Sequence, residues 1–212
     1  MNMNKRNYQR ELDMVLSGIG TGEHPALMLH ACCAPCSSYV LEYLKSHFAI
    51  TLYYYNPNIS SEEEYRKRLE EVRRLIGEYN AALPGPDIRL LEGVWEPERF
   101  FEAVRGLEDE PEGGKRCEAC FRLRLAETLA RAEEAGSDYF TTTLTISPLK
   151  NAELLNEIGE ELAGTSLCWL PSDFKKRDGY KRSIELSHRY GLYRQDYCGC
   201  VYSKREREQR DR

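Results

Sequence analysis

The chain has 212 residues, of which 41% are hydrophobic and 31% are charged, and its formal net charge is -5. This composition predicts a folded protein with a substantial core and excludes an intrinsically disordered chain. It also argues against a dedicated nucleic-acid coat protein, which would be strongly basic, although a local basic face is still allowed.

The hydrophobic pattern predicts strands that alternate with helices along the first half of the chain. A short helix and a Gly-rich break come before a buried strand, the first cysteines, a helix, a β-rich strand and a turn. We expect these elements at residues 11–17, 18–22, 26–30, 32–36, 39–44, 50–55 and 56–58. Ser60 and Glu63 then form a capping box for a charged helix that ends near residue 80.

The second half continues the alternation. We expect a strand at residues 88–91, a helix opened by Pro97, an acidic loop at 108–114, a second cysteine pair opening a helix at 122–135, and a strand at 139–144. Asn151 caps a helix to about residue 162. A basic loop, a helix at 183–190 and an unpaired polar tail complete the chain.

This order predicts an α/β fold with a mainly parallel sheet flanked by helices, in a Rossmann-like or PP-loop-like layout. We find no internal repeat and no long linker. We therefore expect an N-terminal helix and linker at 1–25, a single catalytic domain at 26–203 and a charged tail at 204–212. No apolar run approaches the roughly 20 residues that span a bilayer, and the polar start lacks a secretory signal. These features predict a cytoplasmic protein with no membrane partner.

Seven of the eight cysteines fall in three clusters, which predicts metal or redox chemistry rather than structural disulfides. The clusters are Cys32, Cys33 and Cys36; Cys117 and Cys120; and Cys198 and Cys200. Cys168 stands alone beside Trp169 in an apolar stretch, so we expect it to be buried.

The first two clusters each lie where a helix begins, and helix N-termini favour thiolates and anionic clusters. Parallel strands would bring both clusters to one edge of the sheet, which predicts a four-thiolate site at the C-terminal edge of the strands. Spacing alone leaves zinc, an iron–sulfur cluster and a redox pair open. Because adjacent side chains diverge, vicinal Cys32 and Cys33 favour a cluster over a simple zinc site.

Cys198 and Cys200 are separated by one glycine, which is too close for both thiols to chelate one tetrahedral metal comfortably. A small-ring disulfide can close across Gly199, and its strain would make it labile and catalytic rather than structural. The alternative is a pair of unremarkable thiols near the C-terminus.

Five motifs together resemble the epoxyqueuosine reductases of the QueH type. They lie at residues 29–36, 54–59, 117–120, 141–148 and 197–200, in the order of that family. The resemblance implies reduction of epoxyqueuosine to queuosine at the tRNA wobble position, the last step of queuosine biosynthesis, with an external electron donor. It also implies a [4Fe–4S] cluster held by Cys32, Cys33, Cys117 and Cys120 and a redox-active pair at Cys198 and Cys200. The family's additional mononuclear iron would have Cys36 as our candidate ligand.

Capture of tRNA would require local positive charge. The candidates are Arg66, Lys67, Arg68, Arg73, Arg74, Lys115, Arg116, Arg122, Arg124, Lys175, Lys176, Arg177, Lys181 and Arg182. Residues 53–55, three tyrosines, either stack a flipped base or fill the core. His30 either donates a proton or is satisfied by backbone groups.

Three other functions fit parts of the pattern. A zinc-bearing, non-redox tRNA- or nucleotide-binding protein would be colourless when pure. An ATP-using sulfur transferase of the PP-loop kind needs a Ser/Gly-rich phosphate loop, where this chain has residues 31–36, rich in thiols. A thioredoxin-like oxidoreductase would leave Cys117 and Cys120 unexplained.

Overall fold

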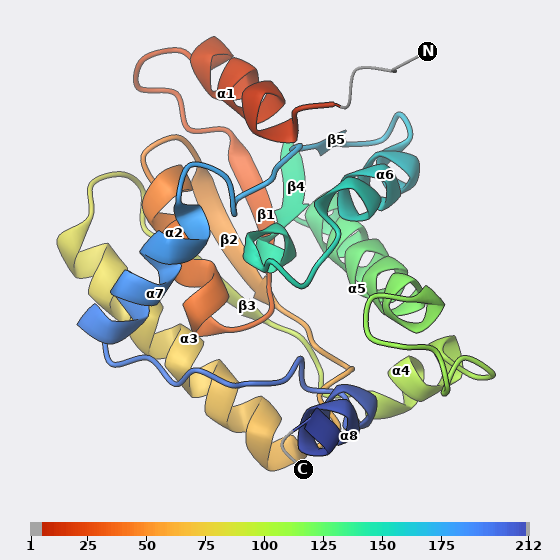
Figure 1. Cartoon of the computed structure of the whole chain (residues 1–212). Helices are drawn as coiled ribbons and strands as arrows, with labels where there is room; N and C mark the ends of the chain where they lie inside the picture. Colours follow the sequence, from red (N-terminus) through yellow and green to blue (C-terminus); the bar gives the residue numbers. More distant parts are fainter. Residues whose placement is uncertain (1–5, 211–212) are drawn as a thin grey trace.

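The computed structural model describes residues 6–210, which form an α/β fold around one parallel sheet (Figure 1). The strand order is β3-β2-β1-β4-β5, and every neighbouring pair is parallel, as the sequence predicts. The strands are β1 (Ala26–Ala31), β2 (Ala49–Tyr54), β3 (Arg89–Glu92), β4 (Tyr139–Thr142) and β5 (Cys168–Trp169).

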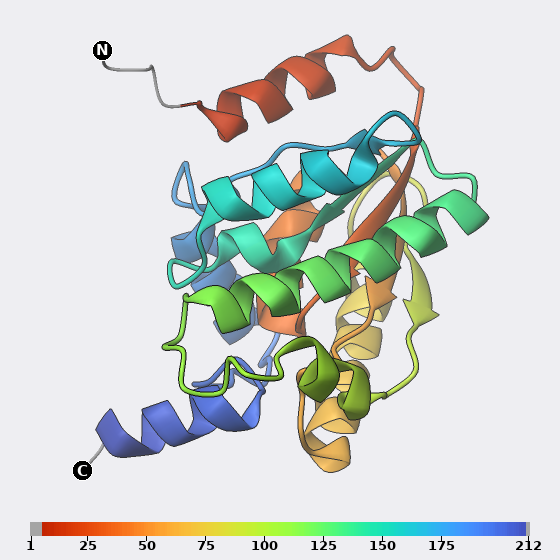
Figure 2. The same ribbon diagram turned by 90° about the vertical axis from the view of Figure 1, so that its right-hand side faces the viewer.

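Helices cover both faces of the sheet because the strands alternate their side chains between two apolar cores. Leu27 and Leu29 of β1 belong to one core, whereas Met28 belongs to the other. Helix α2 (Ala34–Leu44) packs on the first side with α3 (Glu62–Ala82) and α7 (Gly179–Arg189). On the other side α5 (Lys115–Glu134) and α6 (Ala152–Ala163) lie side by side, as Figure 2 shows.

Four further elements complete the described chain. They are α1 (Tyr8–Gly18), α4 (Pro97–Ala103), the 3₁₀ turn η1 (Thr143–Ile146) and α8 (Val201–Arg210). Helix α8 thus takes up most of the segment predicted as a polar tail. None of the helices within residues 6–210 has the length and apolar character needed to cross a membrane.

The strand order places the first cysteines at the point where the sheet reverses direction. The chain moves from β1 outward through β2 to β3, and later returns to the other side of β1 as β4 and β5. Open α/β sheets bind ligands outside the carboxyl ends of the strands at such a point. Residues 32–36 follow β1, and η1 follows β4, so both segments lie there.

Several local predictions need correction. Helix α3 is capped by Ser61, whose hydroxyl accepts from the Glu64 N–H at 3.3 Å, one residue later than the predicted box. The predicted strand at 139–144 ends at Thr142, whose own hydroxyl accepts from the Leu144 N–H and starts η1. Asn151 does cap α6, as predicted. Cys168 is exposed, so its predicted burial is wrong.

Candidate redox and metal site

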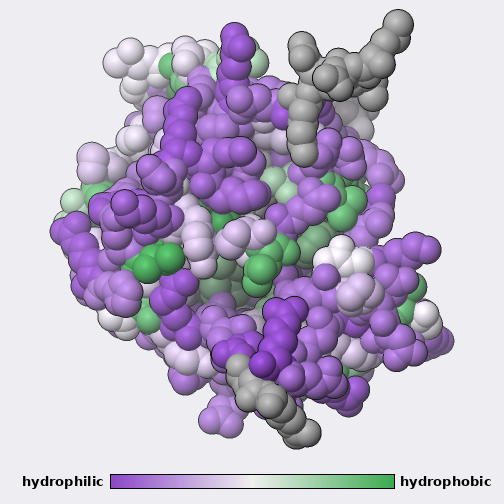
Figure 3. All heavy atoms as spheres, in the orientation of Figure 1, coloured by the Kyte–Doolittle hydropathy of each residue, from purple (hydrophilic) through white to green (hydrophobic). Residues whose placement is uncertain are grey.

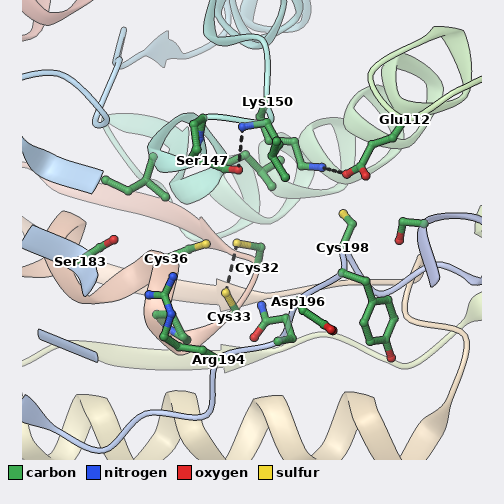
Figure 4. A pocket seen from close by; sticks show the side chains of 18 of the residues that line it. Cys32, Cys33, Cys36, Glu112, Ser147, Lys150, Ser183, Arg194, Asp196 and Cys198 are labelled. Carbon is green, nitrogen blue, oxygen red and sulfur yellow. Dashed lines mark hydrogen bonds and ion pairs between the residues drawn. The ribbon is translucent and has the colours of Figure 1, made fainter. Parts of the chain in front are cut away.

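The three sulfur atoms of the first cysteine segment point toward one another at the start of α2 (Figure 4). The Sγ atoms of Cys32, Cys33 and Cys36 all lie within 4.8 Å of each other, and those of Cys32 and Cys33 are 3.7 Å apart. Cys33 is the N-cap residue of α2. Thr143 holds Cys32 in place, because its hydroxyl lies 3.3 Å from the Cys32 N–H and 3.5 Å from the Cys32 sulfur.

The pKa values of these three thiols are shifted in opposite directions. Hydrogen bonds from the Cys32 and Cys36 thiols stabilise a thiolate at Cys33 and lower its pKa well below the ordinary value. Hydrogen bonds with Cys32 and then Cys33 raise the pKa of Cys36 well above its ordinary value, and the contact with Cys33 raises the pKa of Cys32. Thiolates are the form that binds metals. The segment therefore offers a thiolate donor with two more sulfurs beside it.

The second cysteine pair lies in the first turns of α5, within the helix rather than before it as predicted. The Cys117 sulfur accepts from the Gly113 N–H at 3.2 Å. Cys120 is buried, and burial raises the pKa of its thiol to about 12. Neither belongs to the three-sulfur group around Cys33. Instead both line a narrow gap together with Cys198 and Cys200.

The C-terminal pair depends on a glycine conformation that other residues rarely adopt. Gly199 has φ +121°, and a Cβ there would lie 2.8 Å from Cγ1 of Ile59. Cys198 is half-buried, whereas Cys200 is buried and its sulfur accepts from the Ser203 N–H at 3.3 Å, which caps α8. All eight cysteines of the chain are free thiols in this structure.

The segment after β2 is hydrogen-bonded to both the first and the C-terminal cysteine segments. Asn56 donates to the carbonyl of Ala31, directly before the first cysteines, at 2.9 Å. Asn58 donates to the carbonyl of Cys198 at 3.5 Å, and the Ser60 N–H donates to the carbonyl of Gly199 at 3.2 Å. These contacts give the motif at residues 54–59 a role that its sequence did not reveal: it fixes the two cysteine segments relative to each other.

Arg124 is a buried cation with no carboxylate partner among residues 6–210. Its guanidinium is 2.6 Å from Oδ1 of Asn56, 3.3 Å from Nε2 of His30 and 4.0 Å from the Cys120 sulfur. The side chain is 1% exposed. An unpaired buried charge is costly. The electrostatic neighbours that raise the pKa of Arg124 against its burial are the thiols of Cys120, Cys198 and Cys32.

That arrangement fits an anionic metal group held by cysteine sulfurs. A thiolate-bound iron–sulfur cluster supplies negative charge and accepts hydrogen bonds at its sulfurs. The Gly113 N–H, the Thr143 hydroxyl and Arg124 are donors already placed near the sulfurs of Cys117, Cys32 and Cys120. The residues present therefore fit such a group.

His30 is held by backbone and side-chain groups on both ring nitrogens. Nε2 lies 3.0 Å from the Tyr55 carbonyl oxygen, and Nδ1 lies 2.8 Å from Oγ1 of Thr142. Burial, followed by the charge of Arg124, lowers the pKa of His30 to about 3. His30 is therefore neutral near pH 7, and of the two predicted roles the structure supports the buried, hydrogen-bonded histidine.

A cavity of about 190 Å³ joins the first cysteine segment to Cys198. Figure 3 shows it as a hollow in the face that is turned toward the viewer. The lining charges favour an anion: the five cations outnumber the two acids, which are Glu112 and Asp196. The cations are Arg68, Lys150, Arg194, Arg207 and Arg210.

Lys150 is the buried cation of this cavity that the sequence analysis missed. Its Nζ donates to Oε1 of Glu112 at 3.1 Å, and its side chain is 8% exposed (Figure 4). Burial lowers the pKa of Lys150, but the Cys198 thiol and the Glu112 carboxylate outweigh it, so the pKa rises and the ammonium stays charged. The only sequence signal was its place two residues after Ser147-Pro148.

Most of the predicted RNA-binding cations are engaged elsewhere. Arg68, Arg116 and Arg124 are buried, and of these three only Arg68 lines the cavity. Carboxylates neutralise seven others, which are Arg66, Arg73, Arg74, Arg122, Lys175, Arg177 and Arg182. The tyrosines at 53–55 are buried, and the rings of Tyr53 and Tyr55 stack on each other with centroids 5.8 Å apart. They fill the core, so a nucleobase cannot stack on them.

Comparison with known proteins identifies the family of the chain. A sequence model of the family described as epoxyqueuosine reductase QueH matches residues 27–206. An epoxyqueuosine reductase QueH from Streptococcus pyogenes is 44% identical over 207 residues, which cover 96% of this chain and 80% of the relative. One from Staphylococcus epidermidis is 42% identical over 207 residues, covering 96% of this chain and 87% of the relative. One from Thermotoga maritima is 34% identical over 188 residues, covering 87% and 93%. The chain therefore belongs to the epoxyqueuosine reductase QueH family, a family of oxidoreductases.

Proposed function

We propose that this protein reduces the epoxide of epoxyqueuosine to the alkene of queuosine in tRNA. The observation that carries the proposal is the meeting of two sulfur sites at one cavity: the three clustered thiols at residues 32–36 and the half-buried Cys198. Membership of the QueH family supplies the substrate.

The residues that would hold a [4Fe–4S] cluster are Cys32, Cys33, Cys117 and Cys120, with Cys36 as the candidate ligand of a further iron. When bound, the cluster would relay electrons one at a time at the redox potentials of iron–sulfur chemistry. Arg124 supports this ligand set, because the thiols in its electrostatic reach come from both cysteine segments. Its positive charge would offset the negative charge of the thiolates.

Cys198 and Cys200 supply the electrons and protons of the overall reaction. Removing the epoxide oxygen as water and forming the carbon–carbon double bond takes two electrons and two protons. The two thiols release two of each when they close to a disulfide, so the reaction balances. An external reductant then restores the dithiol. The half-buried position of Cys198 on the cavity suits attack, and the buried Cys200 suits the resolving role.

Lys150 is placed to stabilise negative charge on the substrate. Its ammonium lines the cavity, and the contact with Glu112 fixes its position. A charged donor in a site that excludes water favours the oxyanion that develops as an epoxide opens. Lys150 and the other lining cations also give a chain of net charge -5 a local site for a polyanion such as tRNA.

The test is anaerobic incubation of iron-reconstituted protein and a chemical reductant with tRNA that carries epoxyqueuosine. Nucleoside mass spectrometry should show queuosine formed in many turnovers per enzyme. A brown protein with visible iron–sulfur absorption is expected. A colourless protein that holds stoichiometric zinc and leaves the epoxide intact would overturn the proposal in favour of a non-redox binding protein.

A further inference from the structure

One face of helix α8 forms part of the cavity wall. Ser203, Arg207 and Arg210 are spaced by four and three residues, which places them on the same side of a helix. All three line the cavity. Lys204 and Arg205, which are exposed, do not line it. In Figure 3 strongly hydrophilic side chains border the lower edge of the hollow, where Figure 1 places α8.

Long-range contacts fix this orientation of α8. The Val201 N–H donates to the Ser60 hydroxyl at 3.0 Å, and the Cys200 sulfur caps the first turn. Glu206 accepts from the buried Arg116 at 2.7 Å and from the Glu112 N–H at 3.2 Å. Glu206, an acidic residue of the helix, is thus used for anchoring, while Arg207 and Arg210 face the cavity. The exposed Asp196 partly offsets Arg207 from 3.4 Å.

The rest of the outer rim has a different character. Pro148 and Leu149, in the loop before α6, and Tyr180, at the start of α7, also line the cavity. Leu149 is 65% exposed and Tyr180 is 36% exposed. Apolar and aromatic surfaces suit the faces of nucleobases, whereas arginines suit phosphates.

We infer that α8 binds the RNA backbone phosphates next to the nucleotide that enters the cavity, through Arg207 and Arg210. The neighbouring bases then contact Leu149 and Tyr180 on the opposite rim. This inference rests on the proposed function, since it assigns the surface that receives the tRNA. It also assigns RNA contact to α8 rather than to the cation-rich segments at 66–74 and 175–182, of which only Arg68 and Tyr180 line the cavity.

The test compares two charge-matched double variants of one helix. Arg207→Gln with Arg210→Gln removes the cavity-facing charges, and Lys204→Gln with Arg205→Gln removes the same charge from the outward side. Binding of a fluorescent anticodon stem-loop to the holoenzyme is measured across a salt series, with KM and kcat for epoxyqueuosine tRNA and the iron content. The cavity-facing variant should bind about 10-fold more weakly, with the slope of log affinity against log salt reduced by about 1.5. Its loss of activity should fall on KM, and its iron content should match wild type.

The outward-facing variant should keep the wild-type affinity and salt slope. Equal losses in both variants, or no loss in the cavity-facing variant, would overturn the inference. Failure of the proposed function is a separate result, because it appears as wild-type holoenzyme that forms no queuosine. Stem-loop binding reports on α8 in either case, and a wild type that binds no RNA also overturns the inference.

Discussion

Residues 32–36 and residues 198–200 present sulfur atoms to the same cavity, but different parts of the fold hold them. The first segment joins β1 to α2 at the centre of the sheet, where backbone hydrogen bonds of a strand and a helix fix its conformation. The second lies between α7 and α8. It is held mainly by contacts with the segment after β2 and by one glycine at positive φ.

This contrast suggests that the first segment binds a metal group and that the second undergoes the redox reaction. Three sulfurs on rigid secondary structure, backed by a buried cation, have the fixed geometry that a metal site requires. A pair on a connection outside regular structure can change its covalent state without disturbing the sheet. Substitutions in the two segments should therefore have separable effects on metal content and on turnover.

The largest effect is expected from Cys198→Ser. Loss of the cavity-facing thiol should lower multiple turnover by at least about 10³-fold, because a hydroxyl cannot form the disulfide that releases two electrons. The visible absorption and the iron content should stay at wild-type levels. Anaerobic spectroscopy combined with nucleoside mass spectrometry measures both quantities.

Cys33→Ser is the counterpart in the first segment and should lose iron together with activity. If Cys198→Ser still turns over repeatedly with a chemical reductant, the dithiol is dispensable for the chemistry. If Cys198→Ser instead loses its iron, the two segments do not have separate roles.

Gly199→Ala should produce an intermediate effect. The added Cβ meets Ile59 and the backbone keeps φ +121°, so we expect about 1–3 kcal/mol lower free energy of unfolding and slower turnover at unchanged iron content. Gly136→Ala is the matched control, since Gly136 also has positive φ but no atom within 4 Å of its would-be Cβ. Denaturant titration of both variants isolates the steric part. Equal losses would mean that contact with Ile59 is unimportant.

Arg124→Met should change the stabilisation gained from iron. The metal-free variant should be at least as stable as metal-free wild type, because the cost of burying an unpaired cation disappears. Iron affinity should fall by about 10- to 100-fold, as for other groups that support metal ligands. Thermal unfolding before and after anaerobic reconstitution provides the measurement. Arg124→Lys keeps the charge and should recover part of the gain, and an unchanged gain in Arg124→Met would show that the cation does not support the metal group.

The smallest effect is expected from Cys168→Ser. Cys168 is exposed on the two-residue edge strand β5, away from both cysteine segments. Activity, iron content and midpoint of thermal unfolding should all match wild type. A loss of turnover would reveal a redox role for a thiol outside the cavity.

Much of the fold was predictable from local sequence. Apolar runs alternating with capped helices predicted the parallel sheet and its flanking helices, because burial on both faces leaves that pattern in each strand. Errors arose where the pattern was ambiguous. Residues 143 and 144 continue a β-rich run, yet the Thr142 hydroxyl captures the Leu144 N–H and turns the chain. Trp169 points inward in β5, so its neighbour Cys168 points outward.

The site was predictable only in part, because its members come from distant segments. The cysteine motifs carry their own local signal. The contact between Lys150 and Glu112 joins two loops 38 residues apart, and the sequence of neither loop indicates this contact. Helix α8 resembles a solvated tail in sequence, since its place depends on long-range contacts to Ser60 and Arg116. Arg124 looked like a surface cation because a charged helix does not show in its sequence which charge is buried.

The unpaired guanidinium of Arg124 has a consequence for the cell as well as for the reaction. A ligand that binds only the folded state raises its stability, so a chain that folds without the proposed iron–sulfur cluster would lack that contribution and still contain the buried charge. Cellular proteases degrade the less stable form faster. If the proposed cluster is the bound group, cells grown without enough iron should contain less of this protein, and the amount of enzyme would follow the supply of iron.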